Sequence, residues 1–253
     1  MELDEYARIS AAEDEHWWYR NMRAVCANLL RPWLGTNQTL LDAGCGPGGN
    51  GAWLAGHGNA VGIDRSPTAL TLASQHHREA RRVQGDLVKL PFRDACFDVV
   101  LDVTAAYAIT DDAAAVRELA RVTKPGGAVL LVEPAFAVLW RAHDATVHGV
   151  HRYRRRDLAA LAVAAGLRVE RSTYLYSFLA PPAAILGAVD RWNARRARTR
   201  GPRTQVVAAA PSDIERRSLD RAFAPLAMLE RQWVRRYRVP FGTSVALLAT
   251  RPA

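Results

Sequence analysis

Leu40-Leu41-Asp42-Ala43-Gly44-Cys45-Gly46-Pro47-Gly48-Gly49 is the stretch of this sequence that decides the fold. Its first residues are apolar and predict a buried strand, Asp42 follows near the strand's end, and a glycine-rich turn comes next. Glycine permits positive φ and lets a ligand approach the main chain closely. A helix is expected over residues 50–56, and its first amides would point at that ligand. The stretch therefore predicts a site for a nucleotide-like ligand at the carboxyl end of a parallel strand.

The glycine spacing alone leaves two classes of ligand open. Gly44-x-Gly46-x-x-Gly49 matches the dinucleotide fingerprint, so a nicotinamide or flavin domain has to be considered. That fingerprint, however, expects no acid just before its first glycine, and Asp42 stands two residues ahead of Gly44. The residues that follow decide between the two classes.

Further short strands follow in a regular order. Residues 60–64 end in Asp64, an acid that suits two ribose hydroxyls, and residues 81–84 lead into Gly85-Asp86-Leu87. Residues 97–101 form the next apolar run, and the turn Lys124-Pro125-Gly126-Gly127 leads into residues 128–132. Short apolar runs of this kind are typical of strands that are covered on both faces.

In this order and spacing, residues 38–135 resemble the class I S-adenosylmethionine-dependent methyltransferases of the small-molecule, methyltransferase-domain-11 type. The resemblance implies an α/β, doubly wound, Rossmann-like fold. Its seven-stranded sheet would have the order 3-2-1-4-5-7-6, with the last strand antiparallel. It also implies S-adenosylmethionine as methyl donor and S-adenosylhomocysteine as product.

The resemblance further implies which residues bind this cofactor. The methionine end would be held by Asp42, Gly44, Cys45, Gly46 and Gly48. Asp64 would accept hydrogen bonds from the ribose hydroxyls, and Arg65 would flank the adenine. Asp86 would accept from the adenine amino group, beside the amide of Leu87, and Asp102 and Thr104 would face the methyl group. For Asp64 and Asp86 the structural alternative is a helix cap or a turn.

Residues 2–33 are expected to be helical and carry a second signal. Glu13-x-x-His16-Trp17-Trp18 resembles a subset of these methyltransferases in which an N-terminal helix folds over the cofactor. Arg23 would pair with the methionine carboxylate, while Tyr19 or Trp18 would close the lid, with Trp18 touching the acceptor. The alternative is an aromatic stripe that packs the helix onto the sheet.

Residues 135–153 have no clear period and predict a loop with partial helix over the active face. If the acceptor is a hydroxyl, a general base helps, and the candidates in this segment are His143, His148 and His151. The alternative of a structural histidine stays open for each, and no metal site is predicted. Tyr107, Glu133 and Phe178 are further candidates for binding the acceptor. Leu179, Ile185, Leu186 and Trp192 would line an apolar lid, or simply pack it.

The chain is expected to divide into a lid, a core and a cap. The lid comprises residues 1–35, the cofactor-binding core 36–174 and 243–253, and the helical cap 175–242. Helices are predicted at 67–77, 111–123, 156–165 and from Ser212 to about Tyr237, and the last strands at 167–174 and 244–250. Pro181-Pro182 predicts a break.

The formal charge of +9 comes mainly from arginines, which gather in residues 152–156 and 191–203. An RNA or membrane-surface partner remains an alternative, although few aromatic residues interleave these arginines and nucleic acid is not favoured. Three separated cysteines, the absence of a signal core in the acidic N-terminus and the lack of a long apolar run favour a cytoplasmic protein without a membrane span.

The sequence thus favours a methyltransferase acting on the oxygen or carbon of a small, apolar or aromatic acceptor, with a role in secondary metabolism and a monomeric or homodimeric state. Two alternatives remain. One is a protein of the same fold that binds S-adenosylmethionine but catalyses a cyclisation or rearrangement. The other is the RNA or membrane-surface protein.

Overall fold

The computed structural model describes residues 3–199 and 220–253. Arg200, Arg203 and the predicted helix start at Ser212 lie outside these residues. The strands are β1 (Gln38–Ala43), β2 (Gly58–Asp64), β3 (Arg81–Gln84), β4 (Phe97–Val103), β5 (Thr123–Pro134), β6 (Arg168–Leu175) and β7 (Ser244–Thr250). The helices are α1 (Leu3–Ala12), α2 (Trp17–Leu30), α3 (Gly51–Ala55), α4 (Pro67–His76), α5 (Asp112–Val122), α6 (Ala142–Thr146), α7 (Arg155–Ala164), α8 (Ala180–Thr199) and α9 (Asp220–Val234).

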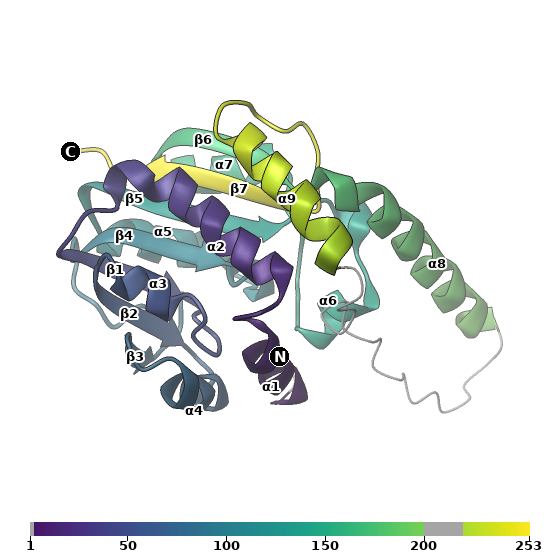
Figure 1. Cartoon of the computed structure of the whole chain (residues 1–253), viewed down its shortest axis with the longest axis horizontal. Coiled ribbons are helices and arrows are strands. Elements are labelled where there is room, and N and C mark those ends of the chain that lie inside the picture. The colour runs from purple at the N-terminus through teal and green to yellow at the C-terminus, as the bar shows by residue number, and fades with distance from the viewer. Residues whose placement is uncertain (1–2, 200–219) are drawn as a thin grey trace.

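The strands form one seven-stranded sheet in the order β3-β2-β1-β4-β5-β7-β6, which confirms the predicted topology (Figure 1). The neighbours from β3 to β5 are parallel, and β7 runs antiparallel to both β5 and β6. At the centre, Asp42 of β1 pairs with Gly62 of β2 and Leu101 of β4. The parallel strands therefore end together at one edge of the sheet.

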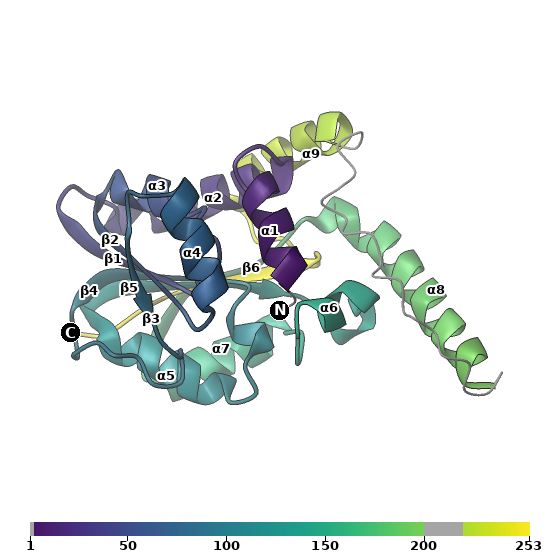
Figure 2. The ribbon, with the colours of Figure 1, turned by 90° about the horizontal axis from the view of Figure 1, so that it is seen from below.

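Helices cover both faces of the sheet because successive strand residues point to opposite sides. Leu40 packs in a cluster with residues of α2, α3 and α9, while its neighbour Leu41 packs with residues of α5 and α7. Figures 1 and 2 show α2, α3 and α9 on one side of the sheet and α5 and α7 on the other. Both leucines are fully buried, as expected for a doubly wound sheet.

The N-terminal region predicted as helical contains two helices that meet at a bend. α1 ends at Ala12, and α2 begins at Trp17 after the residues 13–16. His16 caps α2, since its Nδ1 accepts a hydrogen bond from the amide of Trp18 at 3.3 Å. The bend lets α1 turn across the carboxyl edge of the sheet towards α4, which it contacts (Figure 2).

The predicted helix starts at Ser66 and Asp111 are confirmed by their hydrogen bonds. Ser66 Oγ accepts from the amide of Ala69 at 3.3 Å, with Pro67 in the first turn of α4. Asp111 Oδ1 accepts from the amide of Ala114 at 2.9 Å at the start of α5. Gly166 follows α7 with a φ of +81°, a conformation that glycine adopts readily.

The break predicted at Pro181-Pro182 is wrong. Both prolines lie in the first turn of α8, which continues to Thr199. Proline is tolerated there because the first amides of a helix have no partner within the helix. Within residues 3–199 and 220–253, no helix combines the length and the apolar character needed to cross a bilayer.

Candidate cofactor and acceptor site

A large cavity lies at the carboxyl edge of the sheet, where the sequence predicts the cofactor. Its volume is about 680 Å³, and its walls come from α1, α2, the glycine-rich turn, the segment 134–152 and the start of α8. Pockets that hold small ligands typically measure roughly 300–1,000 Å³. The cavity is therefore large enough for a cofactor together with part of an acceptor.

The glycine-rich turn suits cofactor binding because one side of it packs against the protein and the other side is open to the cavity. A Cβ on Gly44 would lie 2.3 Å from Ala105 Cβ, whereas a Cβ on Gly46 would meet no atom within 4 Å. The amides of Gly44 and Cys45 donate to the carbonyl of Ile63 at 2.8 and 2.9 Å, which ties the turn to β2. Gly44, Cys45 and Gly46 line the cavity, and Gly48 does not.

The two acids predicted to hold the nucleoside both line the cavity. Asp64 accepts hydrogen bonds from the amides of Gly46 at 2.9 Å and Ser66 at 2.8 Å, which fix its carboxylate at the end of β2. Asp86 accepts from the amide of Val88 at 3.1 Å. Each carboxylate oxygen has a second lone pair, so these bonds leave acceptor sites for hydroxyl or amino donors. Arg65 and Leu87 line the same part of the cavity.

Behind this wall lies a row of buried acids at the ends of adjacent strands. Asp42 of β1, Asp102 of β4 and Glu133 of β5 are each at most 2% exposed, and none of them lines the large cavity. Burial raises the pKa of Asp42 to about 7 and that of Asp102 to about 6. Burial and the neighbouring Asp102 hold the pKa of Glu133 well above its usual range. Among the residues that the structure describes, none donates a hydrogen bond to Oδ2 of Asp42.

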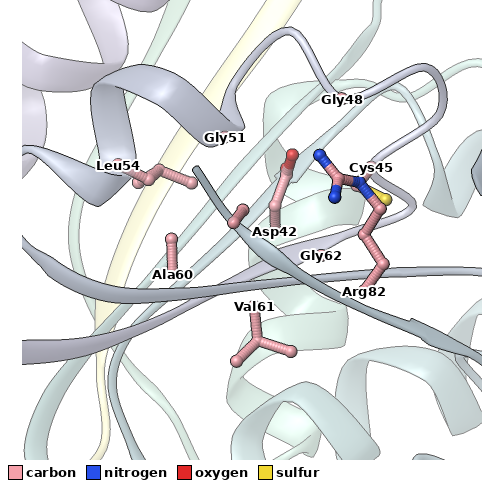
Figure 3. A pocket seen from close by; sticks show the side chains of 10 residues that line it. Asp42, Cys45, Gly48, Gly51, Leu54, Ala60, Val61, Gly62 and Arg82 are labelled. Atoms are coloured by element: carbon pink, nitrogen blue, oxygen red, sulfur yellow. The ribbon is translucent and has the colours of Figure 1, made fainter. Parts of the chain in front are cut away.

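Figure 3 shows the Asp42 side chain rising from β1 towards the glycine-rich turn, with Cys45 and Arg82 beside it. The small space around it measures only about 10 Å³, too little for any part of a nucleotide. Asp42 and Asp102 are therefore placed to influence a ligand in the cavity through their charge and not by contact. Ionisable acids beside the cavity suit the cationic methionine end of S-adenosylmethionine.

The glycine-rich turn is also fastened to the N-terminal helices. Glu13, which is 4% exposed, accepts a hydrogen bond from the amide of Gly49 at 3.0 Å, and its other oxygen lies 2.9 Å from Nε2 of His77. Arg23 donates to the carbonyls of Gly49 at 3.3 Å and Glu13 at 2.7 Å. Burial raises the pKa of Glu13 to about 8 and lowers that of His77. Glu13, Arg23, Gly49 and His77 thus join the N-terminal helices to the glycine-rich turn.

Three strands end at this edge in a backbone conformation that is uncommon outside glycine. Thr104 follows β4, Phe136 follows β5 and Tyr176 follows β6, with φ values of +59°, +56° and +58°. Such residues persist only where the surroundings determine them strongly, and they gather at functional sites. The unusual backbone turns each chain segment away from the sheet and over the cavity.

The aromatic residues at the start of α2 line the cavity and also take part in an aromatic cluster. Trp18, Tyr19 and Tyr107 line the cavity, as predicted for residues near the cofactor and acceptor. Trp17 lies 5.8 Å from Tyr176 and 6.1 Å from Phe178 between ring centroids, in a cluster that joins α2 to α8 and α9. Phe178, predicted to bind the acceptor, packs in this cluster and does not line the cavity. Trp17 also lines the cavity, and Trp18 stacks on Tyr176 with 6.0 Å between ring centroids, so both interpretations apply to the same two tryptophans.

The segment 135–153 is organised by a buried ion pair. Asp144 accepts from Nε and Nη2 of Arg152, each at 3.0 Å, and from the amide of Arg141 at 2.7 Å. Arg152 also donates to the carbonyl of Ala135 at 3.1 Å. These bonds hold α6 in place and bring His143, which lies beside Asp144, to the wall of the cavity.

The structure separates the three candidate histidines. His143 and His148 line the cavity. His151 does not line it, because its Nε2 is hydrogen-bonded to the hydroxyl of Tyr153 at 2.5 Å and lies 3.1 Å from Asp112. Of the predicted cap, Leu179 and Leu186 line the cavity, whereas Ile185 and Trp192 point into solvent.

Sequence reasoning missed the site residues that depend on how distant segments meet. Glu5 of α1 lines the cavity and is 2% exposed, and its Oε1, which accepts no hydrogen bond, lies 4.0 Å from Nδ1 of His143. In the sequence, Glu5 is one acid on an amphipathic helix, and this pattern predicts only a residue exposed to solvent. No group of three or more metal-binding side chains is found within the part of the chain that the structure describes.

Comparison with known proteins gives consistent results. Residues 41–131 match a methyltransferase domain family. A demethylmenaquinone methyltransferase of Mycobacterium marinum is 32% identical over 174 residues, which cover 66% of this chain and 67% of the relative. A malonyl-[acyl-carrier protein] O-methyltransferase of Erwinia billingiae is 41% identical over 98 residues, 37% of this chain and 38% of that protein.

Solved structures share the fold. The methyltransferase in complex with the Trm112 activator of Haloferax volcanii has a TM-score of 0.64 at 20% identity, covering 100% of this chain and 98% of that chain. The [4+2]-cyclase SpnF has a TM-score of 0.56 at 19% identity, covering 91% and 81%. The sheet order, the glycine-rich turn and these matches agree, and the chain belongs to the class I S-adenosylmethionine-dependent methyltransferases.

Proposed function

We propose that this methyltransferase transfers the methyl group of S-adenosylmethionine to an oxygen or carbon of a small, largely apolar, ring-bearing acceptor. The observation that carries the proposal is the cavity of about 680 Å³, which continues from the glycine-rich turn into an apolar wall. That wall includes Trp18, Leu139, Leu179, Leu186 and Phe223. Apolar and aromatic walls favour acceptors with a hydrophobic body.

The glycine-rich end of the cavity would hold the cofactor. Asp64 would accept from the ribose hydroxyls, and Asp86 with the Leu87 amide would bind the adenine, next to Arg65. Arg23 and Tyr19 would close the methionine end from α2. When bound, S-adenosylmethionine supplies an activated methyl group. The protein binds, orients and excludes water, which is most of what such a transfer needs from it.

The proposed general base is His143, oriented by Glu5. Because Nδ1 of His143 faces Glu5, its Nε2 is left to accept a proton from the acceptor. Their separation of 4.0 Å would have to shorten by about 1 Å to form a hydrogen bond, as α1 closes on the bound ligands. Tyr107 lines the cavity nearby, and burial raises the pKa of its hydroxyl, which keeps that hydroxyl neutral and able to donate a hydrogen bond.

Glu133 and Asp102 would support this arrangement from behind. Glu133 accepts from the amides of Ala106 and Tyr107 at 3.2 Å each, and Asp102 accepts from the amide of Ala105 at 3.1 Å. These bonds hold the short turn that carries Tyr107. We therefore propose positioning roles for both acids.

The name of one relative, a demethylmenaquinone methyltransferase, supports a ring-bearing, apolar acceptor. The test is turnover with S-adenosylmethionine and a panel of phenols, naphthols, hydroquinones and carboxylic acids, followed by mass spectrometry of product and S-adenosylhomocysteine. Methylation of a ring-bearing acceptor supports the proposal. Turnover of carboxylic acids alone, or formation of an unmethylated product, would contradict it.

Histidine variants test the assignment of the base. His143→Gln should lower kcat by about 10²–10⁴-fold without weakening S-adenosylhomocysteine binding, because a general base contributes about that much. Glu5→Gln should lower kcat less and shift the pH profile. His151→Gln is the matched control and should leave kcat within about threefold, since this histidine does not line the cavity. An unchanged kcat in His143→Gln would assign no base function to it.

A further inference from the structure

The first half of α8 is an apolar helix that the rest of the described chain leaves largely uncovered. Residues 180–189 contain no charged side chain. Ile185, Val189 and Trp192 are 66%, 45% and 52% exposed. Their spacing of four and three residues places them on one face of the helix. Figures 1 and 2 both show α8 extending away from the sheet.

The second half of α8 is basic. Arg191, Arg195, Arg196 and Arg198 follow a single acid, Asp190. The guanidinium of Arg196 lies 3.5 Å from the centroid of the Trp192 ring, so a cation and an exposed indole occupy the same place on the helix. Tryptophan beside arginine is the combination that suits the headgroup level of an anionic lipid surface.

The end of α9 adds a second exposed aromatic pair with arginines around it. The rings of Trp233 and Tyr237 lie 4.6 Å apart and are both more than half exposed. Arg235, Arg236 and Arg238 are exposed beside them. This repeats the chemistry of α8 on a separate element.

Other apolar residues of the same half of α8 line the cavity. Pro182, Ala183 and Leu186 of this helix line the cavity, and Leu186 is also partly exposed to solvent. An apolar acceptor that enters along α8 would therefore pass from the apolar surface of this helix to the apolar wall of the cavity. This point rests on the proposed function, whereas the exposure and charge of α8 do not.

We infer that α8 docks this enzyme on an anionic lipid surface, with Ile185, Val189 and Trp192 towards the acyl chains, and that the positive charge of its second half attracts it to the anionic headgroups. A large exposed apolar patch next to basic residues marks an interaction site. A second copy of the chain fits less well, because an antiparallel pair of α8 helices would lay the arginine-rich half of each copy on the apolar half of the other. An anionic surface neutralises those arginines instead.

The experiment is cosedimentation of the full chain with phosphatidylcholine vesicles, with and without phosphatidylglycerol. The chain should bind the phosphatidylglycerol vesicles, and binding should weaken as salt is raised. The triple variant I185S/V189S/W192S should lose at least about tenfold in partitioning, because binding scales with the apolar area buried. V163S, which removes a similarly exposed side chain (61%) from α7, is the matched control and should bind normally.

Several results would overturn the inference. One is the absence of binding to anionic vesicles, and another is binding that the triple variant retains. A third is a chain that does not bind vesicles but uses Ile185, Val189 and Trp192 for another contact. That contact would be self-association or binding of an acidic acyl carrier protein. The triple variant should keep its affinity for S-adenosylhomocysteine and its turnover of a water-soluble acceptor, so the failure of docking is separable from the failure of the proposed function.

Discussion

The carboxylate of Glu13 accepts a hydrogen bond of 3.0 Å from the amide of Gly49, and this bond joins the bend between α1 and α2 to the glycine-rich turn. The contact is close: a Cβ on Gly49 would lie 2.4 Å from Oε2 of Glu13. The shape of the cofactor wall thus depends on residues far ahead of the core in the sequence.

Gly49→Ala should displace the Glu13 carboxylate and weaken S-adenosylhomocysteine binding by about tenfold or more. Glu13→Ala alone should cost about 1–3 kcal/mol of binding or folding free energy, because it leaves a buried amide without its partner. The double variant should lose less than the sum, since alanine at position 13 makes room for the new Cβ. Asp4→Ala, which removes an exposed acid of α1, serves as the control. Strictly additive losses in calorimetry would show that the two residues are not coupled.

Asp64→Ala should weaken S-adenosylhomocysteine binding by about 1.5–3 kcal/mol, because the lost acceptor is charged. The control is Asp98→Ala. Asp98 also accepts from a backbone amide, that of Thr39 at 2.8 Å, and it lies outside the cavity. Both variants should be less stable in thermal denaturation, but only Asp64→Ala should bind more weakly. Equal affinities of the two variants would refute the ribose assignment.

Asp42 predicts an unusual pH dependence of stability. Its pKa in the folded protein is about 7, above the usual value near 4, because burial disfavours the charged form. A carboxyl with a raised folded pKa stabilises the fold fully below its unfolded pKa, and this contribution is lost as the pH rises through the folded value. Asp42→Asn should remove that loss, so its advantage over the unmutated protein should grow from pH 4 to 7, by at most about 4 kcal/mol. A difference in unfolding free energy between Asp42→Asn and the unmutated protein that stays constant from pH 4 to 7 would contradict the assignment.

Arg152→Gln should destabilise the protein by about 3–5 kcal/mol, because it leaves the buried carboxylate of Asp144 without its cation. Adding Asp144→Asn should recover part of the loss. Arg156→Gln breaks an exposed pair with Asp157, in which the arginine side chain is 77% exposed, and should cost less than about 1 kcal/mol. Chemical denaturation measures all three variants, and similar losses for both arginines would show that the buried pair does not organise the segment.

Much of the sheet was predictable because its strands are short apolar runs with glycine or acidic residues at their ends. The last strand, Ser244–Thr250, and the third, Arg81–Gln84, have the predicted bounds. Strand β5 begins earlier than predicted, at Thr123, because the Lys124-Pro125-Gly126-Gly127 turn is itself part of the strand's irregular start. Local pattern thus predicts where strands lie better than where they begin.

The candidate site was predictable where a residue belongs to a motif or follows a strand of the predicted sheet. The glycine-rich turn, Asp64 and Asp86 line the cavity as expected. Glu5 could not be predicted, because its role depends on α1 turning across the sheet edge to reach α6. The separation of His143 from His151 likewise depends on the ion pair between Asp144 and Arg152, which no spacing in the sequence reveals.

We propose that the cavity beside Gly46 and Asp64 binds S-adenosylmethionine. Calorimetric titration of the purified chain with S-adenosylhomocysteine and, separately, with NADH tests it most directly. We predict binding of S-adenosylhomocysteine with a dissociation constant on the order of micromolar, worth roughly 8 kcal/mol, and no heat with NADH. Binding of NADH, or of neither compound, would contradict the account.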